Sequence, residues 1–335
     1  MSASVVVCTR NRVDHLRRCL ASLERQLDVD ERTDVVVVDN GSADGTAELL
    51  QQWSATEPAR RRVVHEARPG LSMARNVGVA ATPSSDVVAF LDDDAVAPRG
   101  WLAAHLRCYD TDPAVDAVGG PVVLAWPQGR PAWVTPRLEH WWSALDAGDD
   151  PGLFPRPHGP YGTNMSIRRP TLLAVGQFRT CLGRRGASLI SGEEAAVWAA
   201  VWERGGVIRY EPATLVVHEV VAGPASARVR RRWVLRRGIA QGLTNARLAA
   251  LATPRPAGAV VAACRDDARW LFDQSGDVIR SVFGGGATSS DVLDDIARRS
   301  GHAAAIAEHV RLRLLDAIGV DWRNTGAGGS GAGGS

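Results

Sequence analysis

The sequence contains no lysine, so that all 39 of its lysine-or-arginine positions are arginine. This absence excludes chemistry that needs a lysine amine, including Schiff-base formation and the phosphate-binding lysine of a P-loop. The arginines are nearly balanced by 37 acidic residues, and a net charge of +2 gives no overall case for nucleic-acid binding. With its abundant Ala, Val and Gly, the use of arginine alone indicates a GC-rich, bacterial genome.

Cysteine is scarce and long apolar runs are missing. The five cysteines are scattered without a Cys-x-x-Cys pair, which is typical of reduced thiols in the cytoplasm. No secretory signal opens the chain, and no apolar run approaches the length of a bilayer span. We therefore expect a cytoplasmic protein. The arginine-rich stretch 229–237 is usually the solvated face of a helix, but it leaves open a peripheral contact with an anionic membrane.

What the N-terminal part does contain is an alternation of apolar strands and amphipathic helices. Apolar runs predict strands at 4–8, 34–39, 63–64 and 87–91. Helices are predicted at 13–26, 45–53, 72–80 and 101–108. This spacing predicts an α/β protein with a mostly parallel sheet and helices on both faces.

The later part of the sequence changes character. Residues 119–162 are rich in Pro, Gly and Trp, and predict long loops in which Trp126, Trp133, Trp141 and Trp142 either pack or form a stacking wall for a sugar or acceptor. A helix is expected within 189–204, strands at 207–210 and 214–217, and helices from 225 to 322.

Three consecutive carboxylates, Asp92 to Asp94, follow the strand that ends at Leu91. Like charges this close repel one another and cannot be buried without partners. A hard divalent cation, with a phosphate completing its shell, would hold them together. The alternative is a solvated turn before a helix, where Asp is a common N-cap residue. The first interpretation predicts an enzyme that handles a nucleoside diphosphate.

Four segments occur in the order typical of one known family. They are VVVCTRNR at 5–12, VDNGSADGT at 38–46, GLSMARNVG at 70–78 and LDDD at 91–94. Together they resemble the family-2 glycosyltransferases with the GT-A fold, a Rossmann-like sheet flanked by helices. The resemblance covers about residues 4–242. It implies a catalytic domain at 1–222 and leaves most of the helical C-terminal extension outside it. We expect that extension, at 223–323, to select the acceptor or to support a homodimer, and residues 324–335 to form a flexible linker.

The resemblance implies a nucleotide site at the first two segments. Thr9, Arg12 and Asp39 would line the base pocket, with Asp39 accepting from the imide N–H of uracil. The favoured donor is therefore a UDP-sugar, although dTDP shares the same imide edge. Arg75 would reach the base or the diphosphate, and Asn76 would either contact the donor or brace its loop.

The same resemblance implies a metal site at the acidic run. Asp92 would bind the ribose or a metal-bound water, and Asp94 would ligate Mg²⁺ or Mn²⁺ that bridges the phosphates. His218, in the segment VVHE at 216–219, would be a further metal ligand or else a structural histidine. Asp93 is expected to face away, as the odd residue of an alternating strand.

Two more segments complete the implied site. Asn164, in GTNMSIRR at 162–169, would lie beneath the donor sugar. The family places a general base at the end of a Gly-Glu-Asp segment; here the segment is Gly192-Glu193-Glu194, so Glu194 or Glu193 would take the role. The alternative is that these glutamates only add negative charge at a helix N-terminus. An arginine within 228–237 would close over the diphosphate.

The resemblance implies a hexosyltransferase-type enzyme. It would transfer a sugar from a nucleoside-diphosphate sugar to an acceptor hydroxyl, with inversion and with the help of a metal ion. The acceptor stays open among a glycan, a lipid-linked saccharide, a peptide and a small metabolite. A nucleotidyltransferase is the first alternative, but residues 9–12 lack the Gly-rich, Lys-containing loop that such an enzyme uses. A nicotinamide dehydrogenase is disfavoured because the first strand is not followed by Gly-x-Gly-x-x-Gly. A non-catalytic protein that binds a sugar or a partner is the other alternative.

Overall fold

The computed structural model describes residues 1–27, 33–220, 230–252, 265, 269, 289–317 and 320–324. Arg228, Cys264 and the tail from residue 325, for which the sequence makes predictions, lie outside these residues. The chain divides into two compact units. The first consists of Met1–Pro127, Trp142–Phe178 and Glu194–Val220, and the second of Gln128–Trp141, Arg179–Glu193 and Val221–Ser335.

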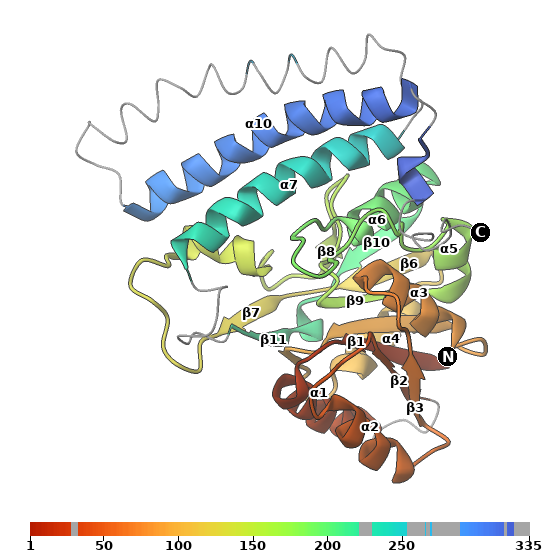
Figure 1. Cartoon of the computed structure of the whole chain (residues 1–335). Helices are drawn as coiled ribbons and strands as arrows, with labels where there is room; N and C mark the ends of the chain where they lie inside the picture. Colours follow the sequence, from red (N-terminus) through yellow and green to blue (C-terminus); the bar gives the residue numbers. More distant parts are fainter. Residues whose placement is uncertain are drawn as a thin grey trace, which may run out of the picture. The chain divides into compact units, whose positions relative to one another are not determined.

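The first unit is built on a sheet of eight described strands in the order β3-β2-β1-β4-β9-β6-β10-β8, next to a small sheet in the order β5-β11-β7 (Figure 1). The strands are β1 (Ala3–Thr9), β2 (Thr33–Asp39), β3 (Arg61–His65), β4 (Val87–Asp92), β5 (Ala95–Val96), β6 (Val115–Gly119), β7 (Val122–Ala125), β8 (Gly152–Leu153), β9 (Asn164–Arg168), β10 (Val207–Tyr210) and β11 (Val216–Glu219). Its helices are α1 (Val13–Leu27), α2 (Thr46–Ala55), α3 (Leu71–Ala80), α4 (Trp101–Thr111), α5 (Arg169–Ala174) and α6 (Glu193–Glu203), whose first residue falls in the second unit.

Valine-rich strands form the centre of the large sheet because both of its faces are buried. Successive side chains of a strand point to opposite faces. Val5 and Val7 of β1 accordingly join one core with residues of α1, α2 and α4, while Val6 joins a second core with residues of α3, α5 and α6. The predicted α/β sheet with helices on both faces is confirmed.

Strands β3, β2, β1 and β4 are mutually parallel, so their carboxyl ends meet at one edge. Strand β9 then enters antiparallel between β4 and β6. In the small sheet, β11 pairs antiparallel with β5 and parallel with β7. The predicted strand 214–217 instead begins at Val216, because Pro212–Thr214 forms a short 3₁₀ helix, η2. The region 119–162 is also less irregular than predicted, since it contains β7, β8 and the 3₁₀ helix η1 (Pro136–Trp142).

The second unit contains two long helices, α7 (Arg231–Leu251) and α10 (Ser289–Ala317), which lie side by side (Figure 1), and the short η4 (Trp322–Asn324). A Cβ atom on Gly238 or Gly242 of α7 would collide with the carbonyl oxygens of Ala297 and Gly301 of α10. Glycine is therefore what lets the two backbones approach this closely. Among the described residues, no helix is both long and apolar enough to cross a bilayer.

Candidate active site

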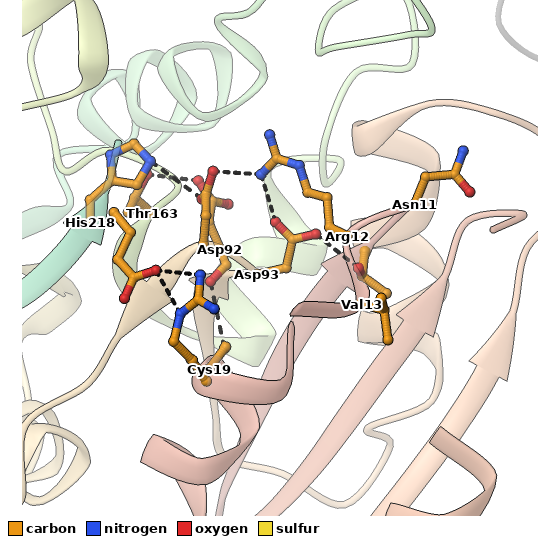
Figure 2. A network of polar contacts seen from close by, with 12 residues as sticks. Asn11, Arg12, Val13, Cys19, Asp92, Asp93, Thr163 and His218 are labelled. Carbon is orange, nitrogen blue, oxygen red and sulfur yellow. Dashed lines mark hydrogen bonds and ion pairs between the residues drawn. The ribbon is translucent and has the colours of Figure 1, made fainter. Parts of the chain in front are cut away.

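The polar segments predicted to form a site gather at the carboxyl ends of β1, β2 and β4. The register of the parallel pairs places Thr9 beside Asp39 and Cys8 beside Asp92. Asp93 and Asp94 lie in the turn between β4 and β5. Figure 2 shows the network of polar contacts that surrounds these carboxylates.

Asp93 points into the site, contrary to the expectation that it faces away. Its carboxylate accepts a hydrogen bond from the hydroxyl of Thr9 at 2.8 Å and one from Nη1 of Arg12 at 2.9 Å. The strand alternation that supported the expectation ends at Asp92, because the chain turns at Asp93. Thr9 and Arg12 are therefore held against the acidic turn, and Figure 2 shows the contact between Arg12 and Asp93.

Arg12 also contacts the neighbouring carboxylate. Its Nη1 lies 2.5 Å from Oδ2 of Asp94, and the side chains of Asp93 and Asp94 are only 7% and 4% exposed. The adjacent Asp94 carboxylate holds the pKa of the Arg12 guanidinium above its ordinary value. Burial raises the pKa of Asp93 to about 6, although Arg12 acts in the opposite direction.

The other oxygen of Asp94 faces a histidine. Oδ1 of Asp94 lies 3.3 Å from Nε2 of His218, and Nδ1 of that ring lies 2.9 Å from the carbonyl oxygen of Trp142. A carbonyl can only accept, so Nδ1 carries a proton. In the neutral ring, Nε2 then directs its lone pair at a carboxylate oxygen. Two lone pairs in this arrangement attract a proton or a metal ion between them.

These residues fit a divalent metal ion. An imidazole nitrogen and a carboxylate oxygen are both common metal ligands, and a backbone carbonyl at the second ring nitrogen is the usual way to orient a ligating histidine. In the described parts of the chain, no three His, Cys, Asp or Glu side chains are grouped closely enough to hold an ion by themselves. An ion such as Mg²⁺ is typically held by one or two carboxylates with substrate phosphates and water. Asp94 and His218 would therefore need only phosphate and water ligands to complete the coordination shell.

Asp92 is held by two donors from other elements. Thr163 donates to Oδ2 at 2.7 Å, and Nη2 of Arg75 lies 3.2 Å from Oδ1. The Asp92 side chain keeps 32% of its surface exposed. Asp92 therefore has a fixed orientation and remains accessible from solvent, whereas Arg75, which holds it, is buried.

Arg75 is buried inside the first unit. Its guanidinium lies over the rings of Phe90 and Phe178, at 6.0 and 5.5 Å from their centroids. Gly162 leaves the room that it needs, since a Cβ there would overlap the guanidinium. The neighbouring Asn76 exchanges two hydrogen bonds with the backbone of Phe178, at 2.9 and 3.0 Å. Asn76 thus ties α3 to the backbone at Phe178, and a contact of Asn76 with the donor stays a prediction.

Asp39 ends β2 as a buried carboxylate. Oδ1 accepts from the backbone N–H of Ser42 at 2.9 Å, and Oδ2 lies 3.3 Å from Nδ1 of His65, an exposed residue at the end of β3. The next residue, Asn40, donates to the carbonyls of Glu66 and Arg68 and accepts from the N–H of Gly70. Asn40 therefore fixes the loop beside Asp39 and the start of α3.

Asn164 is fully buried, and its side-chain amide is occupied. Nδ2 donates to the carbonyls of Pro121 and Thr214, and Oδ1 accepts from Nε1 of Trp101 at 2.9 Å. His105 extends the same network, and burial lowers its pKa to about 3. Asn164 thus ties β9 to neighbouring segments, and it contacts the donor directly only if one of these bonds is exchanged.

The two candidate bases open α6. Glu193 is buried, and Glu194 is half-buried. The later turns of this helix are fixed on the first unit, where Nε1 of Trp198 and of Trp202 donates to the carbonyls of Pro160 and His158. These two hydrogen bonds fix the orientation of α6 against the segment that contains His158 and Pro160.

Two of the loop tryptophans have packing roles. Trp141 is buried and donates from Nε1 to Oδ1 of Asp294 at 2.9 Å, within the second unit. Trp142 is buried too, and makes an edge contact with the ring of Trp126 at 5.5 Å between centroids. Trp133, also in the second unit, lies beneath the guanidinium of Arg231.

Sequence reasoning missed several residues of this network. Thr163 directly precedes Asn164, which the resemblance assigned to the donor site. Its hydroxyl, a possible hydrogen-bond donor, was the signal in the sequence that could have marked it. Arg18 pairs with Glu219. Cys19, labelled in Figure 2, donates to the carbonyl of Asp92 at 3.6 Å. No local pattern marks these last contacts, because they join α1 to distant segments.

Comparison with known proteins identifies the family. The family model described as "Glycosyl transferase family 2" matches residues 4–175, about half of the chain. The chain therefore belongs to glycosyl transferase family 2, and the protein is a glycosyltransferase. The resemblance inferred from its segments is confirmed.

Curated relatives carry different names. The chain is 28% identical to the glucosyl-dolichyl phosphate glucuronosyltransferase of Haloferax volcanii over 248 residues, 73% of this chain and 76% of that protein. It is 29% identical over 252 residues to the succinoglycan biosynthesis protein ExoM of Rhizobium meliloti, covering 73% and 74%. For the pre-mycofactocin glycosyltransferase of Mycobacterium tuberculosis the identity is 30% over 216 residues, 64% of this chain but only 42% of that protein.

Solved structures confirm the GT-A fold. A mannosyltransferase of Pyrobaculum calidifontis, in complex with GDP-Man and Mn²⁺, matches with a TM-score of 0.53 and 20% identity over 92% of this chain and 86% of the other. GalNAc-T7 with UDP, GalNAc and Mn²⁺ matches with a TM-score of 0.52 and 17% identity, over 76% of this chain and 52% of the other. At these identities the likeness concerns the fold alone.

Proposed function

We propose that this glycosyltransferase moves a sugar from a nucleoside-diphosphate sugar to an acceptor hydroxyl, with inversion at the anomeric carbon. The observation that carries the proposal is the pair formed by Asp94 and His218, with Oδ1 and Nε2 at 3.3 Å and the ring oriented by the carbonyl of Trp142. Such a pair, beside two further carboxylates at the ends of parallel strands, suits a metal–diphosphate complex.

Asp94 and His218, with Asp92 directly or through water, would hold Mg²⁺ or Mn²⁺. When bound, the ion supplies Lewis-acid stabilisation of the charge that develops on the departing diphosphate. The presence of Mn²⁺ in both structural neighbours supports this assignment. The chain's own part is to present oriented ligands, with Arg75 and Thr163 keeping the Asp92 carboxylate in place.

Asp39 would recognise the base of the donor. Its Oδ1 already accepts from Ser42, and its Oδ2 would accept a single N–H donor of the base once the exposed ring of His65, 3.3 Å away, turns toward solvent. Uracil and thymine present one imide N–H at this edge, whereas guanine presents two neighbouring donors. We therefore propose UDP first and dTDP second, although one structural neighbour holds GDP-Man and the other UDP.

Glu194 would act as the general base that removes the proton from the acceptor hydroxyl. A base must reach an acceptor that arrives from solvent, and Glu194 is half-buried whereas Glu193 is buried. This difference in exposure favours Glu194 and leaves Glu193 as the alternative. Cytoplasmic location, peripheral membrane contact and homodimer formation stay predictions.

Binding and turnover can be tested without knowing the acceptor. Thermal unfolding with UDP, dTDP and GDP, each with and without Mn²⁺, should show the largest stabilisation by UDP with Mn²⁺, because a ligand raises stability by mass action. Hydrolysis of UDP-sugars should then require Mn²⁺.

Asp94→Asn, which preserves shape, should lower this hydrolysis by about a hundredfold or more. The exposed Asp110→Asn of α4 is the matched control. Normal metal-dependent hydrolysis by Asp94→Asn would refute the proposed site.

A further inference from the structure

Arg12 occupies one oxygen of the carboxylate proposed as the metal ligand. Its Nη1 bridges Asp93 and Asp94, at 2.9 Å from Oδ1 of the first and 2.5 Å from Oδ2 of the second (Figure 2). The opposite oxygen of Asp94 faces His218 at 3.3 Å. A cation placed between Asp94 and His218 would therefore share its carboxylate with a guanidinium that is already positively charged.

Two features make this arrangement adjustable. Arg12 precedes the first residue of α1, and its side chain is 28% exposed, so its long side chain can turn toward solvent while the helix stays in place. The two carboxylates are almost fully buried and fixed in a turn. When a second cation arrives, the arginine is thus the group that moves.

The local charges favour binding of the divalent ion together with a diphosphate over binding of the ion alone. Asp92, Asp93 and Asp94 carry three negative charges, and their partners Arg75 and Arg12 neutralise two of them. A divalent ion added alone leaves the group with an excess positive charge, and the repulsion between ion and guanidinium opposes binding. A diphosphate that arrives with the ion reverses this balance, and it offers Arg12 oxygens that match the planar donor fork of a guanidinium.

We propose that Arg12 couples the two ligands of the site: it weakens binding of the divalent ion to the free enzyme, and it gains phosphate oxygens as partners when a nucleoside diphosphate binds. The inference rests on the proposed function, because it takes Asp94 as the metal ligand. It assigns Arg12 a role in setting the order of binding, in addition to the base-pocket role expected from the sequence.

Isothermal titration of the full chain with Mn²⁺, alone and at saturating UDP, tests the coupling. In the wild type, UDP should tighten Mn²⁺ binding by about tenfold or more, within the usual range of coupling between two sites. In Arg12→Gln, Mn²⁺ alone should bind about tenfold more tightly than in the wild type, and the effect of UDP should shrink accordingly.

Arg17→Gln is the matched control. Arg17 is an exposed residue of α1, close to Arg12 in the sequence. The substitution removes the same formal charge from α1. It should leave both the Mn²⁺ affinity and the UDP effect close to those of the wild type.

Thermal unfolding supplies a second readout. Without metal, Arg12→Gln should melt below the wild type, because two buried carboxylates lose their partner, and Mn²⁺ should raise its melting temperature more than that of the wild type. Arg12→Lys keeps the charge but not the fork, and should show intermediate Mn²⁺ affinity. This variant serves as the test if Arg12→Gln does not fold.

The results separate the inference from the proposed function. If the wild type binds Mn²⁺ and UDP, but Arg12→Gln and Arg12→Lys bind Mn²⁺ no more tightly and retain the full UDP effect, the coupling role of Arg12 is wrong while the site stands. If the wild type binds neither Mn²⁺ nor any of UDP, dTDP and GDP, the proposed function fails, and this inference fails with it.

Discussion

His218 and Asp94 face each other with 3.3 Å between Nε2 and Oδ1, although one lies on β11 and the other in the turn after β4. Strand pairing creates this relationship: His218 is opposite Ala95 in the antiparallel β5–β11 pair, and the N–H of Glu219 donates to the carbonyl of Asp94 at 2.9 Å. The imidazole is thus delivered to the acidic turn by backbone hydrogen bonds, which fix it before any ligand binds.

Replacing this histidine should weaken metal binding. His218→Gln removes the imidazole nitrogen beside Asp94, and we expect the affinity for Mn²⁺ in the presence of UDP to fall by about tenfold or more. Isothermal titration measures the change. His158→Gln, an exposed histidine of the same unit, should bind Mn²⁺ as the wild type does. Unchanged affinity in His218→Gln would mean that this histidine is structural.

A methyl group at Gly162 should disturb donor binding through Arg75. The new Cβ in Gly162→Ala overlaps the guanidinium that holds Asp92, so we expect UDP affinity with Mn²⁺ to fall by about tenfold, on the scale of a lost supporting contact. The control is Gly152→Ala, where a Cβ meets nothing within 4 Å. Equal affinities of the two variants would show that Arg75 does not support the donor site.

Gly192 should be the more sensitive of two glycines in the segment before α6. Both Gly192 and Gly186 have left-handed backbones, with φ of +86° and +55°, but only at Gly192 would a Cβ meet an atom, Cγ2 of Thr244 at 2.5 Å. Gly186→Ala should cost about 1–2 kcal/mol for its backbone conformation. Gly192→Ala should cost a further ~1–3 kcal/mol for overpacking. Urea unfolding of both variants measures the difference, and equal costs would contradict the predicted clash.

The second unit should lose stability in acid through Asp294. Burial opposes ionisation of this carboxyl, but hydrogen bonds from Arg298, Trp141 and Arg137 outweigh it and hold its pKa below the ordinary value. The stabilisation is therefore fully present above the unfolded pKa of about 4 and is lost as pH falls through the lower, folded value.

Thermal unfolding between pH 6 and pH 2.5 checks this linkage. Asp294→Asn should lose about 1.5–3 kcal/mol at neutral pH, because the half-exposed Arg137 and Arg298 lose a charged hydrogen-bond acceptor, and it should show a weaker acid dependence than the wild type. The exposed Asp110→Asn should keep the wild-type dependence. An acid dependence of Asp294→Asn equal to that of the wild type would assign the effect to other carboxyls.

The sequence by itself determined the architecture of the first unit and the place of its site. The run of valines in β2 predicts a strand that is buried on both faces of a sheet, and the stripe of Leu16, Leu20 and Leu23 predicts a helix that packs on one of these faces. Both predictions were possible because each pattern is a local periodicity of the sequence. The order of these elements fixes a mostly parallel sheet, and its carboxyl ends gather Thr9, Asp39 and the acidic run.

Only the tertiary structure decided which side chains meet. The turn after β4 brought Asp93 inward against Arg12, pairing with β5 brought His218 to Asp94, and insertion of β9 beside β4 brought Thr163 to Asp92. Asn164, which the sequence suggested for the donor, was enclosed by Trp101 and two backbone carbonyls. These contacts depend on the register between segments far apart in the chain, and a local pattern carries no information on that register.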